Sequence, residues 1–417
     1  MDLFNDKKFF CGETEQFKIY LFLNNLEERD LHDLYRVKTQ EKAEETFLLT
    51  SLKLPLENRF WPVFHSSFHS KSNRLVMKKK FFEFDRGFVH ARNYLQDHFT
   101  SKDYLDLVVF DHGFDQSPFP GAKNVFFKSD GDSFVEIPDF IDYPLGNTFA
   151  GCSGDWDGDG VPELVIFDLM DTKLPALLSF SNNKLSRNLE RIPHLIEELN
   201  FKPLSGTKFR DFEGKLHLAL GSQGDDFFSP NDLVLKNDGN GFFLKENIET
   251  LPQRRGGDNW ACIEMKSIRF SGDQHDHLLA LYHDASVQHG IVELYLQKEN
   301  GKFSHFDNKG PLISETDSWF YRVEDVILNS GGQDPDSLLC LKSRGLKNFV
   351  KKEYNFTLVT KVGDHFVDIS EELSFLKDKE FSAISKMYSH ERKVHDLIFY
   401  DNHGNYYFCE TKNKNKN

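Results

Sequence analysis

The sequence predicts an all-β protein built from repeated, four-stranded antiparallel sheets, and three observations predict it. A short strand-like segment recurs about every 58 residues, and a hairpin-like segment recurs in phase with it. Phenylalanine is frequent, with 42 in 417 residues, and many lie in alternating patterns such as residues 81–84. Alternation of this kind favours strands over helices, and a fixed period is typical of repeat architectures.

The first repeated segment is a polar residue followed by Leu and a short apolar run. It opens, in steps of 57, 54, 60, 60 and 59 residues, at Asp106, Glu163, His217, His277, Ser337 and Asp396. Short apolar runs between polar turns have the length of strands. We therefore expect a strand at each position, with the segment before it forming the innermost strand of each unit.

The second repeated segment is a strand, a turn rich in Asn, Asp and Gly, and a returning strand. It occurs at residues 125–134, 233–242 and 294–303, with a looser copy at residues 356–366. Gly and Asn tolerate the positive φ that tight turns between antiparallel strands require. Each copy is therefore predicted to be a β-hairpin.

A unit of this size with several short strands corresponds to one blade of a β-propeller. Six units lie within residues 88–410, and seven units would need about 406 of the 417 residues. We therefore expect one closed, seven-bladed propeller, with an irregular N-terminal blade at residues 1–87 and a polar tail at residues 411–417. A strand near residues 18–23 is expected to close the ring by pairing with the C-terminal blade. Residues 27–45 are the one segment predicted to be a helix or an insertion.

Residues 155–164 carry acids at alternate positions with Gly between them, a pattern that can wrap a hard cation such as Ca²⁺. The expected ligands are the carboxylates of Asp155, Asp157, Asp159 and Glu163 and the backbone carbonyl of Val161. An EF-hand shares the opening of this pattern, but its twelfth position requires Glu and is Ile166 here. Turns rich in Asp and Gly also hold their shape without metal, through side-chain-to-backbone hydrogen bonds. The corresponding turns of other units lack the alternating acids, so one calcium ion is predicted.

The same stretch resembles the DxDxDG turn of the FG-GAP or VCBS repeat family, propellers found in integrin alpha subunits, some fungal lectins and many bacterial proteins. Residues 237–242 are similar to the family's NDGxGxF element, and residues 111–124 are similar to a loop in a bacterial branch. The resemblance covers about residues 88–410. It implies a propeller in which the ion stabilises a turn.

Two tryptophans, Trp260 and Trp319, lie one period apart and are predicted to occupy equivalent places on adjacent blades. Indole rings near a polar rim stack on sugars or contact protein partners, but each Trp can equally pack between blades. The polar residues expected near them are Arg92, Arg254, Arg255, Asp258 and Asp317. Loops at residues 111–121, 221–231 and 283–290 are expected to add a recognition surface, with Phe119, Phe227 and Phe228 as apolar anchors, although Phe227 and Phe228 can equally pack within a blade.

Composition excludes several classes of protein. The formal net charge of −15 and the pI near 5.6 argue against nucleic-acid binding, and no apolar run is long enough to span a membrane. Five scattered cysteines without a CxxC indicate reduced core thiols. The N-terminus lacks the pattern of a Sec signal, which predicts a cytoplasmic protein or export by another route. A monomer is expected.

Two functions follow as hypotheses. The first is a calcium-stabilised, non-catalytic recognition module that binds a glycan or a protein surface. The second is an intracellular enzyme or scaffold in glycan or surface-polysaccharide biosynthesis. The sequence carries no HExxH, no GxSxG and no phosphate-binding glycine loop, which favours the first.

Overall fold

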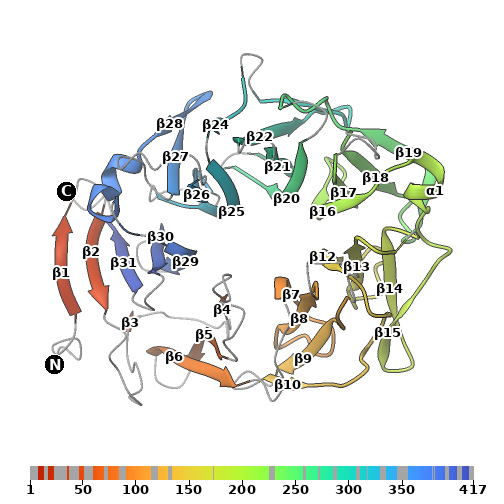
Figure 1. Ribbon diagram of the computed structural model, residues 1–417, viewed down its shortest axis with the longest axis horizontal. Helices are drawn as coiled ribbons and strands as arrows, with labels where there is room; N and C mark the ends of the chain where they lie inside the picture. The colour runs from red at the N-terminus through yellow and green to blue at the C-terminus, as the bar shows by residue number, and fades with distance from the viewer. Residues whose placement is uncertain are drawn as a thin grey trace. The chain divides into compact units, whose positions relative to one another are not determined.

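Figure 1 shows the computed structural model of the chain, in which strands far outnumber helices. The structure describes residues 8–13, 17–22, 35–36, 47–50, 60–69, 74–83, 91–113, 121–129, 134–171, 173–224, 231–256, 260–270, 273–284, 289–306, 310–316, 318–328, 335–344, 356–377, 379, 381–389, 394–401 and 406–412. For residues before 93 and for some positions inside later strands, it describes the backbone alone.

The chain forms two compact units, each described by itself below. The first unit contains residues 1–85, 270–272 and 322–417, and the second contains residues 86–269 and 273–321. The described residues of the whole chain form seven sheets, four with four strands and three with five. Nearly all of their pairings are antiparallel, so the all-β prediction is confirmed.

The described part of the second unit has four sheets in chain order. The β7–β10 sheet, in the order β10-β9-β8-β7, contains β7 (Ala91–Asp97), β8 (Asp106–Asp111), β9 (Val125–Ser129) and β10 (Phe134–Glu136). The β11–β15 sheet, in the order β11-β15-β14-β13-β12, contains β11 (Ile141–Asp142), β12 (Thr148–Gly154), β13 (Glu163–Asp168), β14 (Ala176–Ser181) and β15 (Lys184–Arg187), with β11 parallel to β15.

The other two sheets of this unit follow the same plan. The β16–β19 sheet runs in sequence order through β16 (Pro203–Arg210), β17 (Leu216–Ser222), β18 (Leu233–Asn237) and β19 (Phe243–Thr250). The β20–β24 sheet runs through β20 (Ala261–Ile268), β21 (His277–Asp284), β22 (His289–Gln297) and β23 (Phe303–His305), and β24 (Ile313–Thr316) also pairs with β22.

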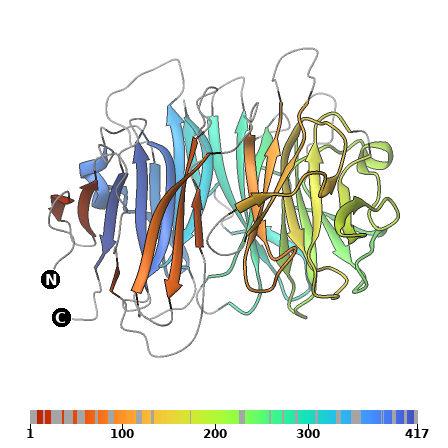
Figure 2. The same cartoon turned by 90° about the horizontal axis from the view of Figure 1, so that it is seen from below.

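Three sheets belong to the first unit, apart from the first residues of β25. The β25–β28 sheet contains β25 (Ser318–Val326), β26 (Ser337–Arg344), β27 (Phe356–Val362) and β28 (His365–Asp368) in sequence order. The β3–β6 sheet, in the order β3-β6-β5-β4, contains β3 (Tyr35–Arg36), β4 (Phe47–Thr50), β5 (Phe60–His69) and β6 (Arg74–Glu83). Figure 2 shows the long strands β5 and β6 side by side, as their pairing over ten residues requires.

The third sheet of the first unit joins both ends of the chain. Its order is β1-β2-β31-β30-β29, with β1 (Lys8–Glu13), β2 (Phe17–Phe22), β29 (Phe381–Ser389), β30 (Val394–Asp401) and β31 (Tyr406–Thr411). β2 pairs antiparallel with β31, with Ile19 opposite Cys409. An N-terminal strand thus pairs with the C-terminal sheet, as the sequence predicts.

The six predicted strands are all present, as β8, β13, β17, β21, β26 and β30. Each is the second strand of its sheet and so has a neighbouring strand on both sides. The first strands, from which this order is counted, are β7, β12, β16, β20, β25 and β29. Every residue of β8 and β13 is buried. The hairpins β9–β10, β18–β19, β22–β23 and β27–β28 occupy the positions of the second predicted segment.

Hydrophobic clusters join consecutive sheets of the second unit. One contains Phe126 of the β7–β10 sheet and Ile166 of the β11–β15 sheet, and the next contains Val165 and Leu218 of the β16–β19 sheet. A third joins the β16–β19 and β20–β24 sheets. In the first unit, the β25–β28 sheet shares a cluster with β29, β30 and β31. A strand in the middle of such a sheet therefore packs on both faces, which explains its continuous apolar run.

The segment predicted to be a helix or an insertion lies almost entirely outside the described residues. Within residues 27–45 the structure describes only Tyr35–Arg36, as strand β3. The described residues contain two short helices, α1 (Leu195–Leu199) and the 3₁₀ helix η1 (Ser370–Leu376). Both are short, with five residues in α1 and seven in η1, and η1 buries Leu373 and Leu376, which lie three residues apart. Neither is long enough to produce a sustained helical period, and no helix of the described residues has the length and hydropathy to cross a bilayer.

Candidate functional site

In two sheets, an aspartate at the start of the second strand accepts hydrogen bonds from backbone N–H groups near the end of the sheet. Asp106 accepts hydrogen bonds from the backbone N–H of Thr100, in the preceding loop, and of Ser129, at the end of the third strand, at 2.7 and 2.9 Å. In the first unit, Asp396 accepts the N–H of Thr411 at 2.8 Å. These side chains satisfy backbone donors at a strand end, where the sheet leaves them without a partner.

In two sheets a histidine has this role. His217 Nδ1 accepts the N–H of Asn237 at 3.1 Å, so Nε2 carries the proton and donates to Asp211 Oδ2 at 2.9 Å. In the next sheet, His277 Nδ1 accepts the N–H of Gln297 at 3.2 Å, and His277 Nε2 donates to Asp273 Oδ2 at 3.0 Å. The loops near residues 211 and 273, which lack the acidic ladder, are thus closed by a His–Asp pair.

The predicted cation loop brings three of its acids together. Oxygens of Asp155, Asp157 and Asp159 lie within 4.8 Å of one another. Each aspartate also accepts one backbone N–H of the same loop. Asp155 accepts that of Gly160 at 3.0 Å, Asp157 that of Asp159 at 3.2 Å, and Asp159 that of Val161 at 2.8 Å. These bonds are the metal-free alternative that the sequence leaves open.

One further observation indicates that a divalent cation fits this loop. Asp155 Oδ1 is buried and has no hydrogen-bond partner among the described residues. Three carboxylates held this close repel one another unless a positive charge lies among them. Hard oxygen donors of this kind suit Ca²⁺, which would take Asp155, Asp157 and Asp159 as ligands.

Glu163, the fourth predicted carboxylate, makes different contacts. It is 3% exposed, and its Oε2 accepts the N–H of Trp156 at 3.0 Å while its Oε1 accepts Arg191 Nη1 at 3.0 Å. Burial raises the pKa of Glu163 to about 7, and these two donors offset only part of that effect. The carboxylate therefore already has two protein partners that hold it at the base of the loop.

Arg191 is the residue that the sequence analysis missed. Its side chain is 8% exposed, and Nη1 lies 3.0 Å from Asp157 Oδ2 and 3.1 Å from Ser179 Oγ, in addition to Glu163. Its Nε donates to the carbonyl of Gly241 at 2.9 Å. One guanidinium thus joins the acidic loop, strand β14 and the turn before β19.

The acidic loop and the Asn–Gly turn of the next sheet, predicted as separate motifs, are in direct contact. Asn237 Nδ2 donates to the carbonyl of Trp156 at 2.7 Å, and the rings of Trp156 and Phe243 pack edge to face with centroids 5.7 Å apart. The N–H of Phe243 donates to the carbonyl of Arg191 at 2.8 Å. The two motifs therefore form one junction between neighbouring sheets.

The tryptophan predicted to bind a ligand is part of a core. Trp260 is 5% exposed and belongs to the cluster between the β16–β19 and β20–β24 sheets. Its ring lies over Gly256, where a Cβ atom would come within 2.3 Å, and contacts His289 edge to face. This is the inter-sheet packing that the sequence leaves open as the alternative to ligand binding.

Arg254 is equally buried and forms an ion pair. Its Nη2 donates to Asp232 Oδ1 at 2.9 Å, and both side chains are 1% exposed. Asp232 also accepts the N–H of Ser222 at 2.7 Å and the hydroxyl of Tyr282, whose ring lies 5.1 Å from the guanidinium carbon. Burial raises the pKa of Asp232, and Arg254 counteracts that effect. Through the hydroxyl of Tyr282 in β21, Asp232 links the β16–β19 sheet to the β20–β24 sheet.

The remaining predicted ligand residues are placed only in part. Arg255 is half-buried, and its N–H donates to Glu293 Oε1 at 2.7 Å. Arg92 lies in β7 and Trp319 in β25, and only their backbone is described. The predicted positions that lie outside the described residues are Asp258, Asp317, Phe119, Phe227 and Phe228.

Two large apolar side chains are exposed at one end of the β11–β15 sheet. Leu145 is 65% exposed and Met170 is 56% exposed. The N–H of Leu169 donates to the carbonyl of Asn147 at 3.0 Å, and the N–H groups of Asn147 and Met170 both donate to Asp168 Oδ1, at 3.1 and 2.8 Å. These bonds hold the start of β12 against the end of β13. Leu145 and Met170 therefore lie on adjoining segments, before β12 and after β13, outside the three loops expected to build a recognition surface.

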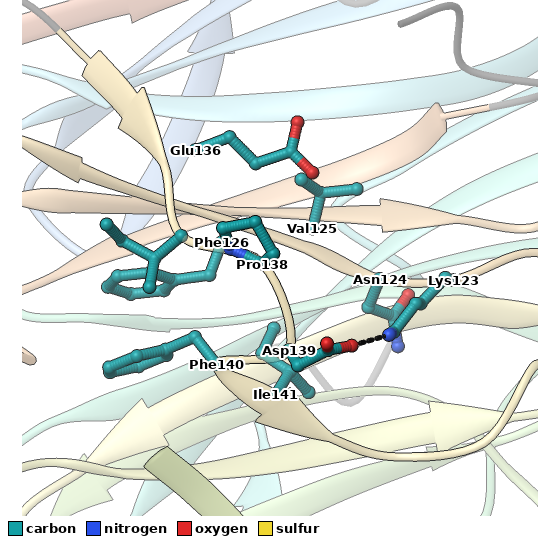
Figure 3. Close-up of a pocket in the computed structure, with 10 residues that line it drawn as sticks. Lys123, Asn124, Val125, Phe126, Glu136, Pro138, Asp139, Phe140 and Ile141 are labelled. Carbon is teal, nitrogen blue, oxygen red and sulfur yellow. Dashed lines mark hydrogen bonds and ion pairs between the residues drawn. The ribbon is translucent and has the colours of Figure 1, made fainter. Parts of the chain in front are cut away.

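A small pocket lies on the β7–β10 sheet (Figure 3). The rings of Phe126 and Phe140 stack beside it with centroids 3.7 Å apart, and Lys123 forms an ion pair with Asp139. Asp139 has φ of 57°, a left-handed conformation that is uncommon outside Gly and Asn. Lysine and aspartate neutralise each other here, so neither provides an unpaired charge for a ligand.

Comparisons with known proteins add little. No protein-family model and no curated protein matches the chain. Two solved structures that resemble it are complexes of BBS1N with ARL6DN, one soaked with mercury and one with lead. The first structure is 10% identical to this chain, with a TM-score of 0.35, and the alignment covers 77% of this chain and 91% of the other. The second has 10% identity, a TM-score of 0.36 and coverage of 77% and 92%. We draw no conclusion from a likeness at this level.

Proposed function

We propose that this chain is a calcium-stabilised, seven-bladed β-propeller that acts as a recognition module for a protein surface. The seven sheets among the described residues and the core clusters between consecutive sheets support the propeller. The buried, partnerless Asp155 Oδ1 within the acidic loop supports the calcium site. Recognition rests chiefly on one observation, the exposed pair of Leu145 and Met170.

A protein is the favoured ligand because of how the polar and apolar groups are distributed. Trp260 and Arg254, which a sugar would need at the rim, are engaged inside the core. Leu145 and Met170 instead expose apolar side chains to solvent on adjoining segments at a strand end. Exposed apolar groups at loops on a rigid sheet are typical of protein contact sites.

The calcium site is tested by thermal unfolding with 5 mM CaCl₂ or with EDTA. A ligand at about 100 times its Kd stabilises the folded state by about 2.7 kcal/mol, so calcium should raise the Tm. Asp159→Ala should abolish the rise. Asn300→Ala is the matched control, because Asn300 is also an exposed turn residue whose side chain accepts a backbone N–H group, in the β22–β23 hairpin of another sheet. An equal rise in Asp159→Ala, or no rise in the wild type, would contradict the site.

The recognition surface is tested with a defined probe, a phage-displayed library of random peptides selected on the immobilised protein in calcium. We expect selected peptides to bind the wild type saturably and to lose at least tenfold in affinity for Leu145→Ser/Met170→Ser. The control is Val362→Ser/Val367→Ser, which changes two exposed apolar residues on the β27–β28 hairpin. Equal loss in both variants would refute the surface, and so would saturable binding on a glycan array with no peptide binding.

A further inference from the structure

We propose that Arg191 couples cation binding at the acidic loop to the conformation of the turn at residues 237–243 in the neighbouring sheet. The proposal rests on the calcium site proposed above and adds a regulatory role for that site. Arg191 acts here as a positioning residue, because it binds Asp157 and Glu163 and does not itself ligate a cation.

The first step is a competition for one carboxylate. Asp157 Oδ2 accepts Arg191 Nη1 at 3.0 Å, and Asp157 is also one of the three acids within 4.8 Å of one another. A divalent cation held by these acids brings a second positive charge close to the guanidinium. Like charges repel, and the Arg191 side chain is only 8% exposed and little hydrated, so the cation weakens the hold of Asp157 on Arg191.

The second step is that the guanidinium has little room to move. The side chain is 8% exposed, and a Cβ atom at Gly241 would lie 1.7 Å from Nη2, so the backbone of Gly241 packs directly against it. Gly241 also has φ of +82° and accepts Nε–H of Arg191 through its carbonyl at 2.9 Å. A shift of the guanidinium must therefore change the contact with Gly241.

The third step is the direction of the effect. Asn237, Gly241 and Phe243 of the turn all bond to Arg191 or to the acidic loop. A cation that loosens Arg191 should loosen this turn. By linkage, removing the guanidinium charge should tighten cation binding, since coupling between two sites is reciprocal. A merely structural role for Arg191 predicts the opposite, because loss of a loop contact would weaken the site.

The experiment measures two quantities in wild type, Arg191→Met and Arg191→Lys. Calcium affinity is measured by displacement of terbium, whose luminescence Trp156 in the loop can sensitise. Hydrogen exchange of the peptide covering residues 237–243 is followed with and without calcium. We expect calcium to speed exchange of this peptide at least threefold in the wild type and to have no effect on it in Arg191→Met. We expect Arg191→Met to bind calcium at least fivefold more tightly, with Arg191→Lys, which keeps the charge, near the wild type.

Two controls separate this coupling from general effects. The hairpin at residues 294–303 is closed by His277 instead of an arginine, and its exchange should not respond to calcium. Arg210→Met removes an exposed arginine that bonds Gly214 in another loop and should leave both quantities unchanged. Calcium binding without a change at residues 237–243, or weaker binding in Arg191→Met, overturns the coupling alone. Absence of calcium binding in the wild type overturns both the site and the coupling.

Discussion

Replacing Arg254 by Met should destabilise the second unit by about 3–5 kcal/mol, because it leaves the buried carboxylate of Asp232 without its counter-charge. The Nη2 to Oδ1 distance is 2.9 Å, and both side chains are 1% exposed, so water cannot replace the lost partner. For a unit of this size, each kcal/mol corresponds to about 2–4 °C in Tm, which gives a fall of about 6–20 °C.

The loss should depend on pH in a defined direction. Burial raises the pKa of Asp232 in the folded state, and Arg254 opposes that shift, so the variant raises this pKa further. A carboxyl whose pKa is higher in the folded state binds more protons there, and folding weakens as pH rises above the unfolded value. The deficit of Arg254→Met should therefore be largest at pH 7–8 and should shrink toward pH 5.

Urea unfolding followed by tryptophan fluorescence measures both effects, because Trp156 and Trp260 lie in the second unit. The control is Arg210→Met, at an exposed position, with an expected change within about 0.5 kcal/mol. The double variant Asp232→Asn/Arg254→Met removes both charges and should be more stable than Arg254→Met alone. A loss below about 1 kcal/mol in Arg254→Met, or a loss equal at pH 5 and pH 8, would refute the buried-pair reasoning.

Three further outcomes are expected. In urea unfolding, Gly241→Ala should lower the free energy of unfolding by about 1–3 kcal/mol more than Gly239→Ala, because both glycines have positive φ but only Gly241 faces Arg191. Equal losses in the two variants would contradict that packing. Trp260→Ala should cost about 3–5 kcal/mol by the same method, as expected for a large core residue, whereas a rim ligand would cost little. In the native protein, Ellman's reagent should label no more than one of the five cysteines, because four are buried and burial raises the pKa of the Cys152 thiol to about 12. Rapid labelling of two or more cysteines would contradict this burial. The buried thiols are Cys152, Cys262, Cys340 and Cys409.

The six repeated strands were predictable because packing between neighbouring sheets favours a continuous apolar run in the second strand of each of these sheets. The polar residue at its start was equally visible, since Asp106 and His217 occupy the same place in the period. What that residue does was not visible, because its partners lie far along the chain. Asp106 bonds Ser129 and His217 bonds Asn237, and only the folded sheet brings each pair together.

The long-range charge pairs escaped prediction for the same reason. Arg191 lies 50 residues from Gly241, and nothing in its local sequence distinguishes it from a solvent-exposed arginine. Arg254 was noticed, but as a ligand-binding residue, because exposure cannot be inferred from residue type. One usable signal was present. Asn124 and Asp232 each directly precede the third strand of their sheets, and each accepts the N–H of the residue that ends the second strand.

The described loops before the second strands show why a cation would be needed at the β11–β15 sheet and not where a histidine closes the loop. In each loop, one side chain at the start of the second strand must bind backbone groups of the loop and of the end of the third strand. His217 does this with both ring nitrogens, because one accepts from Asn237 and the other donates to Asp211, leaving no excess charge. In the β11–β15 sheet, Glu163 is an acid, and Arg191 links it to Ser179 on the third strand. The guanidinium compensates Glu163 and part of Asp157, which leaves Asp155 and Asp159 as uncompensated acids. A divalent cation is therefore expected at this loop and not at the loops closed by a histidine.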